Sequence, residues 1–476
     1  MSASHSQAQP AAEALVASTL IQPRWLVAGG APGVMSSSAP GVASGVAQAS
    51  SGQLLSEHTV ALADRHIVAV LPNAEAEARF PQADRVRLEQ HLLIPGLVNA
   101  HGHSAMSLMR GIADDIPLKA WLEQHIWPLE AQFVSEEFVQ AGAMLACAEM
   151  IRSGTTCFAD MYFFPEQVAK VVGKVGIRAQ LASPVLDFTT AWAQDANDYI
   201  SKATRLRDEF RGHPLVTVAF GPHAPYTVSD EPLKKIAMLA AEMELPIHIH
   251  LHETAGEVAD AVAQNGCRPL ERLHKLGLVT PQLVCVHATQ LTMGEIELLG
   301  KCGANVVHCP QSNLKLASGF CELAKLLAQP VNVALGTDGC ASNNDLDMLG
   351  EMQMAALLGK GVAGDASVVT AQQTLAMATI NGARALGLDE FIGSIEPGKY
   401  ADLTAINLHH LNTLPVYDPV SALVYSARAN QVSHVWCDGR LLLKDGELQT
   451  IDEARVRATA QQWQQQIQAA DMSGRK

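Results

Sequence analysis

The sequence has few aromatic residues and lacks long apolar runs. Of its 476 residues, 5% are aromatic and 48% are hydrophobic. This balance suits packed layers of helices and strands better than a disulfide scaffold or a coiled coil. No apolar run reaches the roughly 18 residues of a membrane-spanning helix. Residues Met1 to Pro10 also lack the pattern of a secretory signal peptide. We therefore expect a globular cytoplasmic protein with no membrane partner.

Positive charge is also scarce. The chain carries 33 Lys and Arg against 48 Asp and Glu, a formal net charge of -15. Proteins that bind nucleic acid use clustered Lys and Arg, so we expect no nucleic-acid partner. A small nucleoside without phosphate remains compatible with this charge. The nine cysteines are scattered and odd in number, which indicates reduced thiols rather than a disulfide framework.

The two ends of the chain differ in pattern from its middle. Residues 1–21 are rich in Ala, Ser and Gln and predict a disordered tail, and a second Gly/Ser-rich stretch, 29–52, predicts a flexible loop. Short strand-like runs occur near both ends. They predict a composite β-sandwich domain built from residues 22–91 and 398–450, followed by a C-terminal helix over 451–476.

Residues 92–397 alternate short β-rich runs with helical stretches, the pattern of a parallel βα repeat. Eight repeats predict a (β/α)8 TIM barrel, in which the chemistry lies at the carboxyl ends of the strands. The expected strands are 92–99, 155–160, 178–186, 215–221, 246–252, 283–287, 305–309 and 331–336.

Polar side chains stand at or just after the ends of these runs. A single histidine in such a place is more often a core or surface residue than a ligand. Their shared position at one barrel face nevertheless favours a common site. The residues are His101, His103, His223, His250, Glu253, His287 and Asp338.

A mononuclear metal site is the interpretation that this set favours. His101 and His103 flank one residue, so in an extended segment both side chains point the same way. His248 and His250 repeat this spacing, and we choose His250 because it is nearer the strand end. With Asp338, three imidazoles and one carboxylate suit one divalent ion, zinc first and iron(II) second, with a position open for water.

The remaining polar residues suggest how such an ion would be used. It lowers the pKa of a bound water to about 7. Asp338 can accept the water's proton. When a purine is attacked at C6, a protonated Glu253 can supply a proton to the ring nitrogen N1. His287 would orient the attacking group or the developing oxyanion. A solvated carboxylate at a helix start is the alternative for Glu253.

Two absences narrow the chemistry further. Binuclear barrels of this kind bridge two ions with a carboxylated lysine on the fourth strand, and the run from Leu215 to His223 contains no lysine. We therefore expect one ion. The paired His-x-Glu and Pro-Cys-x-x-Cys motifs of the other deaminase architecture are also missing.

These residues occur in motifs that resemble a known family. From about Trp25 to Asp452 the chain resembles the amidohydrolase superfamily, related to chlorohydrolases, and within it the methylthioadenosine and S-adenosylhomocysteine deaminases. The motifs are PGLVNAHGH (95–103), MRG (109–111), WL (121–122), WPLE (127–130), FGPHAPY (220–226), HLHET (250–254), SNLKL (312–316) and GTDGCASNN (336–344).

The resemblance implies roles for individual residues. It places Glu130 on the ribose hydroxyls, and His223 and Trp121 along the nucleoside. Glu253 and His287 are implied at the reacting carbon, with Asp338 shared between metal and substrate. The implied metal ligands are His101, His103, His250 and Asp338. The alternatives are a solvated rim carboxylate for Glu130 and an ordinary core aromatic for Trp121.

We expect the substrate to be 5'-methylthioadenosine, converted to 5'-methylthioinosine and ammonia. Homologues that accept S-adenosylhomocysteine place an arginine where this chain has Ser183, and residues 187–195 contain no Lys or Arg. A carboxylate-bearing tail needs such a partner. A methylthio group needs only an apolar surface, for which Trp192, Met106 and Leu108 are candidates.

Other readings stay open at this point. They are a deaminase of S-adenosylhomocysteine, adenosine, guanine or 8-oxoguanine, a triazine hydrolase, and a non-catalytic barrel. Whether the protein forms a homo-oligomer is also open.

Overall fold

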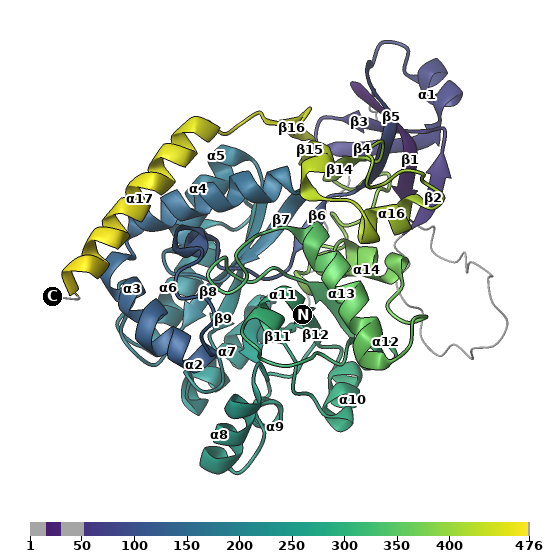
Figure 1. Cartoon of the computed structure of the whole chain (residues 1–476). Coiled ribbons are helices and arrows are strands. Elements are labelled where there is room, and N and C mark those ends of the chain that lie inside the picture. Colours follow the sequence, from purple (N-terminus) through teal and green to yellow (C-terminus); the bar gives the residue numbers. More distant parts are fainter. Residues whose placement is uncertain (1–15, 30–51, 475–476) are drawn as a thin grey trace, which may run out of the picture.

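The computed structural model describes residues 16–29 and 52–474, which form a barrel and a second sheet (Figure 1). The tail expected before residue 16 and most of the Gly/Ser-rich loop lie outside the described residues. Within these ranges no helix is long and apolar enough to cross a membrane.

Eight parallel strands form the barrel, each paired with the next in chain order. A hydrogen bond of 2.9 Å from Ala100 N to Leu335 O joins its first and last strands. The predicted (β/α)8 barrel is thereby confirmed. The strands are β6 (Leu97–Asn99), β7 (Thr155–Asp160), β8 (Arg178–Val185), β9 (Val216–Pro222), β10 (Ile247–Leu251), β11 (Leu283–His287), β12 (Asn305–His308) and β13 (Asn332–Leu335).

Local capping sets the limits of the helices that surround the barrel (Figure 1). Side chains of Ser135, Asp195 and Thr292 accept hydrogen bonds from the first turns of their helices. Gly176 and Gly303 end helices in the left-handed conformation. The helices include α4 (Glu136–Arg152), α5 (Pro165–Val175), α6 (Ala196–Glu209), α7 (Asp230–Met243), α8 (Ala255–Asn265), α10 (Met293–Cys302) and α13 (Met348–Ala363).

The first expected barrel strand, residues 92–99, is wrong as a single strand. Strand β5 (Asp84–Pro95) pairs in the other sheet, and the barrel begins only at β6. Gly96 separates the two strands, where a Cβ would lie 2.1 Å from Thr156 Oγ1. The apolar run itself does not indicate the change of sheet, because both halves are buried.

The second sheet combines both ends of the chain, as predicted. Its nine strands follow the order β17-β16-β15-β14-β5-β1-β3-β4, with β2 beside β1. Residues 19–21, expected in the tail, belong to β1. The remaining strands are β1 (Thr19–Ala28), β2 (Gln53–Ser56), β3 (His58–Ala63), β4 (His66–Pro72), β14 (Leu403–Asn407), β15 (Val432–Cys437), β16 (Arg440–Lys444) and β17 (Glu447–Leu448).

Helix α17 (Glu453–Gly474) follows the sheet and runs along the outside of the barrel (Figure 1). Trp463 on this helix packs edge-on against Phe138 of α4, with ring centroids 5.1 Å apart. The domain boundaries that we expect from the sequence remain predictions.

Candidate active site

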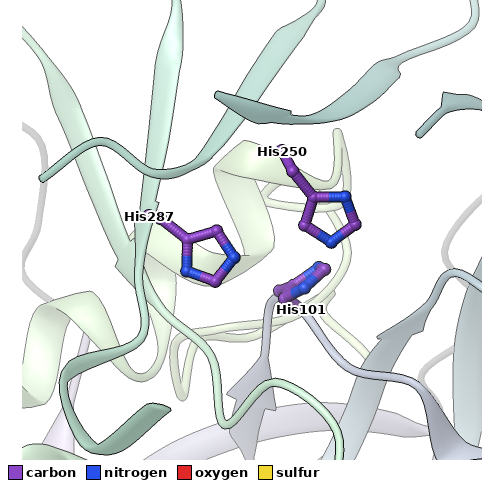
Figure 2. A group of neighbouring side chains, drawn as sticks. All are labelled: His101, His250 and His287. Atoms are coloured by element: carbon purple, nitrogen blue, oxygen red, sulfur yellow. The ribbon is translucent and has the colours of Figure 1, made fainter. Parts of the chain in front are cut away.

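Five polar side chains converge at the carboxyl ends of the barrel strands. His101 and His103 follow β6, His250 lies in β10, His287 ends β11 and Asp338 follows β13. Figure 2 shows the rings of His101, His250 and His287 turned toward one another. His287 and Asp338 have φ of 74° and 64°, a left-handed conformation uncommon for residues other than glycine. The chain therefore turns sharply where these side chains enter the site.

The ligand atoms of these residues are close enough to share one cation. Asp338 Oδ1 lies 3.3 Å from His101 Nε2 and 3.2 Å from His103 Nε2. His250 Nε2 lies 3.4 Å from His103 Nε2. The atoms of His101, His103 and Asp338 lie within 4.8 Å of one another, as do those of His101, His250 and His287. The buried Nε2 of His101 has no hydrogen-bond partner among the described residues.

The second ring nitrogen of each histidine is held by a neighbour. Two of these neighbours are backbone carbonyls, which fix the proton on Nδ1 and leave the Nε2 lone pair facing the cluster. The contacts are His101 Nδ1 with His248 Nε2 (2.9 Å), His103 Nδ1 with Met161 O (2.6 Å), His250 Nδ1 with His223 O (2.7 Å) and His287 Nδ1 with Asn313 Oδ1 (2.9 Å).

Asp338 is fixed by three donors of its own. Its Oδ2 accepts hydrogen bonds from Ser312 Oγ (2.6 Å) and Ser342 Oγ (2.8 Å), and its Oδ1 from the Gly339 amide (2.8 Å). Burial opposes ionisation of this carboxyl, but the imidazoles of His101 and His103 that face it hold its pKa well below the usual range. Asp338 is therefore a carboxylate.

Glu253 is buried beside this cluster. Its Oε2 lies 3.7 Å from His287 Nε2. Its backbone amide donates to Glu257 Oε2 (2.7 Å), and its carbonyl accepts from Thr289 Oγ1 (2.7 Å). Burial raises the pKa of the Glu253 carboxyl, which favours the protonated form. Glu253 thus has the position and the environment of a proton donor.

A cavity of about 510 Å³ opens onto the cluster. The five side chains that the resemblance assigned to substrate all line it: Trp121, Glu130, His223, Glu253 and Asp338. Burial raises the pKa of Glu130 to about 7. Within the described part of the chain, no Lys or Arg lines the cavity. The aromatic and aliphatic lining away from the cluster includes Leu122, Ile126, Trp127, Phe163, Leu186 and Phe188.

Two of the three apolar candidates for the substrate's 5' group lie outside this cavity. Met106 lines it, but Trp192 and Leu108 do not. Trp192 packs against Tyr199 instead, with ring centroids 5.7 Å apart. The sequence indicates an aromatic residue near the third strand but not its direction.

Several contacting residues received no role from the sequence. Tyr162 donates a hydrogen bond to Glu130, and Ser312, Asn313 and Ser342 hold Asp338 and His287. Three of them stand in the quoted motifs, which is the signal that could have found them. His248, the other histidine of the fifth strand, contacts His101 Nδ1 through its Nε2.

Polar side chains gathered at the carboxyl face of a (β/α)8 barrel are typical of the enzymes built on this fold. Comparison with known proteins is more specific. A model described as "Amidohydrolase family" matches residues 92–442. The chain belongs to the amidohydrolase family.

Individual relatives are similar over nearly the whole chain. A 5-methylthioadenosine/S-adenosylhomocysteine deaminase of Teredinibacter turnerae is 52% identical over 88% of this chain and 94% of its own length. A protein of the same name from Saccharophagus degradans is 49% identical over 89% and 95%. A crystal structure of an adenosine deaminase from Xanthomonas campestris with bound zinc is 47% identical, with a TM-score of 0.89 over 95% of this chain and 99% of that one.

Proposed function

We propose that this protein is a zinc-dependent deaminase of 5'-methylthioadenosine, releasing 5'-methylthioinosine and ammonia. The observation that carries the proposal is the cluster of Nε2 and Oδ1 atoms beside a largely apolar cavity, which Glu130 also lines and where its carboxylate can accept hydrogen bonds from ribose hydroxyls. The names of the relatives and the zinc in the Xanthomonas campestris structure support it.

His101, His103, His250 and Asp338 would hold the ion. The unpartnered, buried Nε2 of His101 supports this assignment, because such an atom is costly without a partner. Three imidazoles and a carboxylate are a donor set that suits zinc. When bound, the ion activates water by lowering its pKa to about 7.

The chain's own groups then move the protons. Asp338, held ionised, takes a proton from the water and can pass one to the departing amine. Glu253 delivers a proton to ring nitrogen N1 as the C6 centre becomes tetrahedral. His287, anchored at Nδ1 by Asn313, faces the cluster with Nε2 and orients the attacking oxygen.

The cavity also supports a choice among substrates. Glu130 provides an acceptor for a cis-diol, which a free base such as guanine lacks. The absence of Lys and Arg among the described lining residues favours the uncharged methylthio group over the charged homocysteine tail. Adenosine lacks the apolar group, a difference worth about 1 to 3 kcal/mol, or roughly 10 to 200-fold.

Metal removal and reconstitution test the proposal. The chelated protein should release no ammonia from 5'-methylthioadenosine, and one equivalent of zinc should restore turnover. A protein that binds stoichiometric zinc and still deaminates no purine nucleoside would overturn the activity. A protein that binds no zinc or iron would support the non-catalytic barrel instead.

A further inference from the structure

One short segment at the end of β7 contacts both the loop that carries the metal-site histidines and the proposed ribose-binding residue Glu130. Its three consecutive residues are Asp160, Met161 and Tyr162. The Asp160 carboxylate accepts from the Ser104 amide (2.6 Å), and the Met161 carbonyl lies 2.6 Å from His103 Nδ1. The Met161 amide in turn donates to Gly102 O (2.9 Å). This segment is therefore tied to the loop that carries His101 and His103.

The third residue of the segment, Tyr162, contacts Glu130. Tyr162 OH donates to Glu130 Oε1 at 2.7 Å, and both residues line the cavity. Glu130 comes from α3 (Trp127–Phe133), which is far from β7 in sequence. Among the described residues, no side chain other than Tyr162 donates to the Glu130 carboxylate.

The Tyr162 side chain is held in place by its surroundings. Its side chain is 4% exposed and stands against Phe163, with ring centroids 5.3 Å apart. Burial and the neighbouring Glu130 raise the pKa of its phenol well above the usual value, so the hydroxyl keeps its proton and remains a donor. A buried donor aimed at a carboxylate fixes one oxygen and leaves the other available.

We propose that Tyr162 is a specificity-determining positioning residue: its hydroxyl holds Glu130 Oε1 so that Oε2 meets the ribose hydroxyls at a set distance from the metal site. The inference rests on the proposed function of Glu130. Its chemical consequence is a preference for nucleosides with a free cis-diol over analogues without one.

Tyr162→Phe removes the hydroxyl and keeps the ring. We expect KM for 5'-methylthioadenosine to rise roughly tenfold, about 1.4 kcal/mol, with kcat within about twofold of wild type. KM for the 2',3'-dideoxy analogue should not change, because that analogue has no diol to present. Tyr199→Phe is the matched control: its buried hydroxyl bonds to Thr190 Oγ1 (2.6 Å) and not to Glu130.

A double-mutant cycle with Glu130→Ala separates the inference from the function on which it rests. In the Glu130→Ala background, Tyr162→Phe should have no further effect on KM. If Tyr162→Phe alone leaves KM unchanged while Glu130→Ala raises it, the positioning role is wrong and the role of Glu130 survives. If Tyr162→Phe raises KM equally for 5'-methylthioadenosine and for the 2',3'-dideoxy analogue, the phenol does not act through the diol and the positioning role is wrong. If Glu130→Ala itself has no effect, the assignment of Glu130 fails.

Discussion

Glu253 is buried beside the proposed reacting atoms and is not a surface carboxylate. It stands 3.7 Å from His287 and is buried, yet it is absent from the groups of side chains that could hold an ion. Its backbone is held on both sides, by Glu257 and Thr289. We therefore propose that Glu253 transfers protons and does not bind the metal.

Glu253→Gln tests that separation. The amide is similar in size but cannot give up and recover a proton, so kcat should fall by at least about 10². Zinc content, measured by elemental analysis, should remain one per chain. Loss of zinc in this variant would make Glu253 a ligand instead.

His248 acts on the site through another residue. Its Nε2 lies 2.9 Å from His101 Nδ1, and the two rings stack with centroids 5.1 Å apart. The contact fixes the ring that carries the unpartnered Nε2. His248→Phe keeps a ring in this place but removes the acceptor.

We expect His248→Phe to weaken zinc binding by about 10 to 100-fold, as losses in outer contacts of metal ligands do. Competition with a chelator measures the effect without relying on turnover. His248→Gln, whose amide oxygen can replace Nε2, should recover part of the affinity. Equal affinities for His248→Phe and wild type would remove His248 from the site.

At the scale of helices and strands, periodicity and apolar runs predict most of the barrel. Seven of the eight expected strands agree with the structure within one residue at each end. The remaining one, the first expected strand (92–99), is wrong because residues 92–95 and 97–99 are equally buried but pair in different sheets. A sequence pattern reports burial, whereas the choice of partner strand depends on long-range packing.

The same distinction applies to the site. The sequence could bring His101, His103, His250 and Asp338 to one face, because His250 lies near the end of an apolar run and the other three follow one. Contacts across the barrel, such as Tyr162 with Glu130, depend on how the helices dock. No local pattern carries that information.

Helix α17 provides a test at this scale. Trp463 contributes apolar contact to Phe138, but neither residue lines the cavity. Trp463→Ala should therefore destabilise the protein by about 1 to 3 kcal/mol and leave kcat/KM unchanged. The neighbouring exposed Gln464→Ala should change stability by less than about 0.5 kcal/mol. Urea unfolding compares the two; a large loss of activity in Trp463→Ala would show that α17 supports the site.

For the whole molecule, a buried ion pair connects the barrel to the second sheet. The Arg178 guanidinium at the start of β8 lies 3.1 Å from Asp402 Oδ2 and 3.3 Å from Asp438 Oδ1. It also donates to the Pro214 carbonyl at 2.7 Å. These contacts hold Arg178 at the amino ends of the barrel strands, whereas the cavity lies at their carboxyl ends. Arg178 is therefore not available as the cation for a charged substrate tail.

Breaking this pair should be costly. Arg178→Met leaves Asp402 as a buried charge without its main partner and should destabilise the fold by about 3 to 5 kcal/mol. Adding Asp402→Asn removes that charge and should restore part of the loss. If the double variant unfolds at the same or lower urea concentration than Arg178→Met, the ion pair does not join the two sheets in the way described.

The identity of the preferred substrate can be measured by comparing three nucleosides. The kcat/KM for ammonia release should be measured side by side for 5'-methylthioadenosine, S-adenosylhomocysteine and adenosine with the zinc-loaded protein. We expect 5'-methylthioadenosine to have the highest value, with adenosine lower by roughly 10 to 200-fold. A value for S-adenosylhomocysteine equal to or above that for 5'-methylthioadenosine would contradict it.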